Sequence, residues 1–152
     1  MADRSDQISN GQRALWTFLL YMLVMPLIGA ITAIVLLLVA VVIGQAPGPF
    51  AKAATSDALN QLGGFGVLAF VWCVIPSAFT AIGVLPAVWK YGTVGWFMAG
   101  ACGVIAFTAA ILIFPFPTGI LQPVLAFAAG LVAVICRQIL LRGGIIRHEA
   151  TD

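Results

Sequence analysis

The chain has 152 residues, of which 62% are apolar and 8% are charged. This composition excludes a water-soluble monomer, because seven basic and five acidic side chains leave too little polar surface to cover a globule of this size. A net charge of +2, with the cations spread along the chain, argues against nucleic acid as a partner. The sequence therefore predicts an all-α integral membrane protein.

The first apolar run covers residues 14–43 and predicts the first of four transmembrane helices. Its length of about 45 Å exceeds the roughly 30 Å of a hydrocarbon core. We expect Pro26 to bend it, because proline donates no backbone N–H and clashes with the preceding turn. A cleaved secretory signal is the rival interpretation, but its apolar region would span about 7 to 15 residues, and Asp3 and Asp6 precede this run.

Three further apolar runs complete a predicted four-helix bundle, at residues 66–89, 94–114 and 120–141. The first of these three contains Pro76 and Pro86 and is expected to be kinked. Because the connections between the last three helices are tight, these helices are expected to be antiparallel neighbours. Residues 1–13 and 142–152 are left as tails.

Positive charge predicts how the bundle is oriented in the membrane. A four-span arrangement places six of the seven cations on one side and Lys52 on the other; the six are Arg4, Arg13, Lys90, Arg137, Arg142 and Arg147. Since cytoplasmic loops carry the excess of Lys and Arg, both termini are expected in the cytoplasm. The absence of an organelle-targeting presequence favours the bacterial cytoplasmic (inner) membrane.

The outer loop at residues 44–65 is the one substantial segment predicted outside the membrane. Within it, residues 50–62 have helical periodicity, with apolar side chains on one arc and polar side chains on the other. This pattern predicts a helix lying flat on the membrane surface. An ordinary flexible loop is the alternative, because the apolar face consists mostly of alanine.

Small residues predict where the helices pack most closely. Gly95, Ala99 and Gly103 recur every fourth residue in the third run, and the fourth run carries a matching strip of Ala126, Gly130 and Ala133. Such residues let helix backbones approach each other in membranes. We expect these two strips to meet within one chain, and contact between two molecules is the alternative.

Two polar groupings are candidates for function. Pro76, Ser77 and Thr80 form a polar kink whose hydroxyls either bond to carbonyls one turn back or line a solute path. Arg137 and Arg142 lie near the end of the fourth run. The flexible side chain of Arg137 either reaches the membrane interface, or the two arginines hold an anionic lipid headgroup between them.

Catalytic chemistry has few candidate residues in the predicted spans. All five carboxylates and the one histidine, His148, fall in the tails or the outer loop. Nucleophilic, metal and haem catalysis each need a base or a ligand set at the site. The sequence therefore predicts no catalytic residues, no metal site and no cofactor.

The pattern as a whole favours a protein that works by contact with other proteins. We expect a non-catalytic accessory, assembly or stabilising subunit of a larger membrane complex, or a self-associating bundle, with membrane lipids and other membrane subunits as partners. The alternative function is a small oligomeric channel or carrier for a neutral or weakly polar solute, with the kink at Pro76 lining its path.

Overall fold

The computed structural model describes residues 9–42, 55–114 and 122–147, with the backbone alone for residues 55–62. Within these residues the chain is entirely helical apart from short connections. The helices are α1 (Asn10–Val42), α2 (Thr55–Tyr91), α3 (Trp96–Ile113) and α4 (Gln122–Arg142). Each is long and apolar enough to cross a membrane. The predicted all-α fold with four helices long and apolar enough to span a membrane is thereby confirmed for the described residues.

Helix α1 begins at Asn10, four residues before the predicted start, because a capping box precedes it. The Gln12 N–H donates to the Ser9 hydroxyl at 3.3 Å, and the Ser9 N–H donates back to the Gln12 side chain at 3.2 Å. This reciprocal pair satisfies two backbone donors at the helix start.

Helix α2 differs most from the sequence prediction. Residues 55–62, expected in a separate surface helix over 50–62, are continuous with the span expected at 66–89. Gly63, Gly64 and Gly66 each lower helix stability by only about 1 kcal/mol, so they weaken α2 without ending it. Residues 50–54 lie outside the described residues.

Two glycines with positive φ end the helices at one end of the bundle. Gly92, with φ of 71°, follows α2, and its N–H donates to the Val88 carbonyl at 2.9 Å. Gly144, with φ of 67°, follows α4 in a Schellman motif, in which Gly144 bonds back to Leu141 and Ile145 bonds back to Leu140. Glycine fits both positions because it has no Cβ to clash in the left-handed region.

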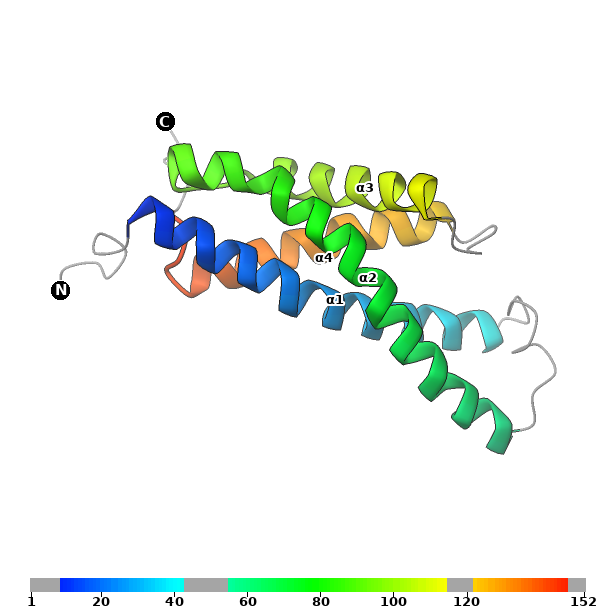
Figure 1. Cartoon of the computed structure of the whole chain (residues 1–152). Coiled ribbons are helices and arrows are strands. Elements are labelled where there is room, and N and C mark those ends of the chain that lie inside the picture. Colours follow the sequence, from blue (N-terminus) through cyan, green and yellow to red (C-terminus); the bar gives the residue numbers. More distant parts are fainter. Residues whose placement is uncertain (1–8, 43–54, 115–121, 148–152) are drawn as a thin grey trace.

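The helices pack as a ring in chain order, with α4 returning to contact α1 (Figure 1). The contact of α1 with α2 and that of α3 with α4 are the most extensive. Helix α2 changes direction along its length, so its N-terminal half runs away from α3 while its C-terminal half lies beside it (Figure 1). It contains Pro76 and Pro86, which supply a cause for such a bend.

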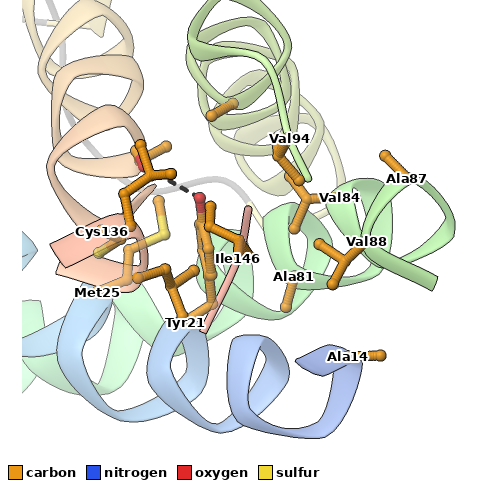
Figure 2. Close-up of a cluster of buried hydrophobic side chains, with 14 of the residues drawn as sticks. Ala14, Tyr21, Met25, Ala81, Val84, Ala87, Val88, Val94, Cys136 and Ile146 are labelled. Carbon is orange, nitrogen blue, oxygen red and sulfur yellow. Dashed lines mark hydrogen bonds between the residues drawn. The ribbon is translucent and has the colours of Figure 1, made fainter. Parts of the chain in front are cut away.

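The apolar core lies in the half of the bundle where α1 begins and α4 ends, and Figure 2 shows it. Tyr21 is 1% exposed and donates its hydroxyl to the Ala133 carbonyl of α4 at 3.0 Å. Met25, Val84 and Cys136 pack in the same cluster. Long apolar side chains such as Leu23, Ile105 and Leu112 point outward instead, which suits a surface that faces lipid.

Small residues bring α3 and α4 together. A Cβ added at Gly103 would lie 2.7 Å from the Ala129 carbonyl oxygen and 2.9 Å from the Ala133 Cβ. Across the same contact, a Cβ on Gly130 would meet Val104 at 2.8 Å. Ala99 and Ala133 are fully buried and Ala126 is half-buried, whereas Gly95 is the N-cap residue before α3.

Replacing Gly103 by leucine is expected to destabilise the fold by about 3 kcal/mol, the upper end for overpacking, because the obstacle is backbone and not a flexible side chain. The measurement is thermal unfolding of purified protein in detergent. Gly64→Leu is the matched control, since a Cβ there meets nothing within 4 Å. Equal melting temperatures for the two variants would contradict this prediction.

Candidate functional site

A cavity of about 120 Å³ lies between the four helices, in the half of the bundle remote from Gly92 and Gly144. Its walls are residues between Met25 and Leu37 of α1, between Phe65 and Ser77 of α2, Phe107 of α3, and residues between Leu125 and Val132 of α4. It is partly open at the surface. We call this cavity the slot.

The lining of the slot is almost entirely hydrocarbon. Trp72 and Phe107, which both line it, are in edge-to-face contact with ring centroids 5.3 Å apart. Thr32 and Ser77 are its hydroxyl residues, and each donates to a carbonyl of its own helix: Thr32 to Ile28 at 2.8 Å and Ser77 to Cys73 at 2.6 Å. Neither hydroxyl proton is therefore directed at a solute.

The three residues of the expected polar kink lie within about one turn of α2, but only two of them line the slot. Pro76 and Ser77 line the slot, while Thr80 is fully buried outside its lining and donates to the Pro76 carbonyl at 2.7 Å. Pro76 has no N–H for the carbonyl one turn back, and its ring disturbs the turn. The two hydroxyls therefore supply hydrogen bonds to carbonyls beside the proline.

The opposite half of the bundle contains two buried arginines. Arg137 of α4 is 6% exposed, and its Nε donates to the Val94 carbonyl. Arg13 of α1 is 0% exposed, and its Nη1 donates to the Ile145 carbonyl at 2.8 Å. We call the end that contains these residues, Gly92 and Arg147 the arginine end.

Backbone bonds join the same segments at the arginine end. The Arg147 N–H donates to the Gly92 carbonyl at 3.0 Å, and the Thr93 hydroxyl donates to the Arg147 carbonyl at 2.9 Å. Three parts of the chain therefore meet there: the start of α1, the turn between α2 and α3, and the segment after α4. The arginines act as hydrogen-bond donors to irregular backbone, which membrane proteins tolerate where it is internally satisfied.

Arg137 and Arg142 do not form one site. Arg137 points into the bundle, where it bonds to Val94, whereas Arg142 is exposed at the last turn of α4. Five residues apart on a helix, the two side chains lie about 140° apart around its axis. A lipid headgroup held jointly between them is therefore not supported by this geometry.

Sequence reasoning counted Arg13 as a cation of the tail and missed its structural role. A signal was present, since Arg13, Thr17, Tyr21 and Met25 recur every fourth residue, and all four are buried on one face of α1. Placing Arg13 inside the bundle needed the acceptor at Ile145, which is 132 residues away in the chain.

Comparisons with models of protein families, with curated proteins and with solved structures found no match to this chain.

Arg13→Met is expected to release the segment after α4, because it removes a hydrogen bond from a charged donor, a class that contributes about 1.5–3 kcal/mol. The readout is hydrogen–deuterium exchange over residues 143–147, where the Arg147 N–H reports on the contact with Gly92. Arg142→Met is the control, because its side chain is exposed. Unchanged exchange in Arg13→Met, or an equal rise in both variants, would refute the role given to Arg13.

Thr17 offers a second test, in which the same substitution by valine at two threonines is expected to change the stability of the fold in opposite directions. Its buried Oγ1 has no hydrogen-bond partner among the described residues. Since Thr→Val removes that unsatisfied group without changing shape, Thr17→Val should stabilise the fold by about 1 kcal/mol. Thr80→Val removes a made bond and should destabilise it by about 0.6 kcal/mol. Melting in detergent measures both, and a loss of stability in Thr17→Val would contradict the assignment.

Proposed function

We propose that this chain is a non-catalytic accessory, assembly or stabilising subunit of a larger membrane complex, with a self-associating bundle as the homo-oligomeric form of the same function. We place it in the bacterial cytoplasmic membrane, with the arginine end facing the cytoplasm. Arg13, Lys90, Arg142 and Arg147 lie at or near that end, and the excess of Lys and Arg marks the cytoplasmic side.

The observation that carries this proposal is how the polar side chains of the described helices are used. Tyr21 joins α1 to α4, Arg137 joins α4 to the turn before α3, and Arg13 joins α1 to the segment after α4. The hydroxyls of Ser77 and Thr80 bond within α2. These groups stabilise one packed arrangement of the helices. A subunit that acts through its shape and surface needs such a fixed arrangement.

The close contact of α3 and α4 limits which surface a partner can use. Gly103 of α3 packs against α4, and Gly130 of α4 packs against α3, so neither glycine is available to a second protein. A partner would instead meet the outward faces, where Trp96, Phe97 and Leu112 are exposed. In a membrane such faces contact lipid until another helix replaces it.

The decisive experiment is mild extraction of the tagged chain from its native membrane, followed by native mass analysis. We expect a stoichiometric complex with one other membrane protein, recovered again when that protein carries the tag. Deletion of this chain should lower the steady-state amount of the complex, because a stabilising subunit binds the assembled state.

A monomer that extracts alone, with no complex altered by the deletion, would overturn the proposal. A homo-oligomer without a partner would fit the self-associating bundle, and a transport assay would then distinguish it from the alternative of a small channel or carrier. In that case solute flux into liposomes should change in the double variant Ser77→Val with Thr80→Val, and sealed liposomes would exclude transport.

A further inference from the structure

We propose that the slot is a binding site for one compact apolar molecule, such as an apolar gas or a hydrocarbon of about four carbon atoms. The proposal goes beyond the accessory function, because it concerns a small ligand and not a protein partner. It does not depend on which complex the chain joins. Three properties of the slot carry the inference: its volume, the chemistry of its lining and the small side chains that leave it free.

The volume of the slot sets the size of the ligand. It measures about 120 Å³. A water molecule takes about 30 Å³ of liquid, so the slot has room for about four groups of that size. An apolar cavity of about 150 Å³ binds benzene or xenon, whereas pockets for drug-sized ligands measure about 300–1,000 Å³. The slot therefore suits a molecule somewhat smaller than benzene and excludes a drug-sized one.

The lining of the slot selects an apolar occupant over water. A buried water needs about two to four polar partners, and apolar cavities of similar size stay dry. The hydroxyls of Thr32 and Ser77 already donate within their own helices. The rings of Phe65, Trp72 and Phe107 provide apolar contact surface, as aromatic side chains commonly do in ligand pockets. An apolar molecule therefore gains dispersion contacts there without losing hydrogen bonds.

Small side chains on three helices leave the space of the slot free. Gly29 and Ala33 line it from α1, Ala69 lines it from α2, and Ala128 and Ala129 line it from α4. Protein interiors are close-packed, and an unfilled void costs stability that grows with its volume. A ligand that fills the slot restores the contacts that the void forfeits. Because the slot is partly open, a molecule of this size can enter it.

The test uses the fluorescence of Trp72, which lines the slot. Trp16, Trp89 and Trp96 are more than half exposed, and all three are changed to phenylalanine. This single-tryptophan protein, purified in detergent, is titrated with ethyl bromide, a compact apolar molecule whose bromine quenches tryptophan on contact. Ethyl bromide dissolved in the detergent quenches without saturation, whereas binding at a single site saturates.

We expect saturable quenching of Trp72 by ethyl bromide. Ala128→Leu should abolish the saturable part, because the longer side chain takes up most of the slot. Ala126→Leu is the matched control and should retain it, since Ala126 is half-buried on the same helix and does not line the slot. Ala33→Leu fills the slot from α1 and replaces the first variant if that variant does not fold, with folding checked by thermal melting.

Two further quenchers test the size limit and the dryness of the slot. Bromoadamantane carries the same bromine on a rigid apolar cage that is too large for about 120 Å³, so its quenching of Trp72 should not saturate. Acrylamide is polar and is added to the water, so it should have little effect on Trp72.

Four results would overturn the proposal. Quenching by ethyl bromide that never saturates in the parent protein would show that Trp72 has no such site beside it. Saturation that persists in both Ala128→Leu and Ala33→Leu would place the site outside the slot. Saturable quenching by bromoadamantane would contradict the size limit, and strong quenching by acrylamide would show a hydrated slot. Each of these results leaves the extraction experiment unaffected, so the ligand site and the accessory function can fail separately.

Discussion

Backbone groups that leave a helix at a buried position need a partner from the protein, and this requirement organises the structure. The chain leaves regular helix at the turn after α2 and at the segment after α4, and Pro76 disturbs α2. Donors lie at each of these places. The Arg147 N–H donates to the Gly92 carbonyl, the Arg137 side chain to Val94 and the Arg13 side chain to Ile145. Beside Pro76, the Ser77 hydroxyl donates to the Cys73 carbonyl.

The same requirement explains how two arginines come to be buried in so apolar a chain. A guanidinium group carries several N–H donors and no acceptor, so it suits carbonyls that a helix has left without a bond. Burying its charge is costly unless hydrogen bonds are made, and Arg13 and Arg137 both make them. The consequence is a packed end where the first and last described helices are held beside the turn between α2 and α3.

The number and type of the helices could be predicted from the sequence, because a long apolar run without charge has few other stable forms in lipid. The start of α2 could not, since Gly63 and Gly64 weaken a helix without ending it. The start of α1 was readable in the Ser9 and Gln12 capping box. Burial of Arg13 was not, because its acceptor at Ile145 is distant in sequence.

The two halves of the bundle differ in what stabilises them. At the arginine end, hydrogen bonds between distant segments fix the packing, and the core around Tyr21 is closed. In the other half, α2 runs away from α3 (Figure 1). The slot lies there among apolar walls. Contacts among those walls are dispersion contacts, which are weak for each pair of atoms and have no preferred direction. The hydrogen bonds that join distant segments are therefore concentrated at the arginine end, whereas the slot is lined almost entirely by apolar side chains.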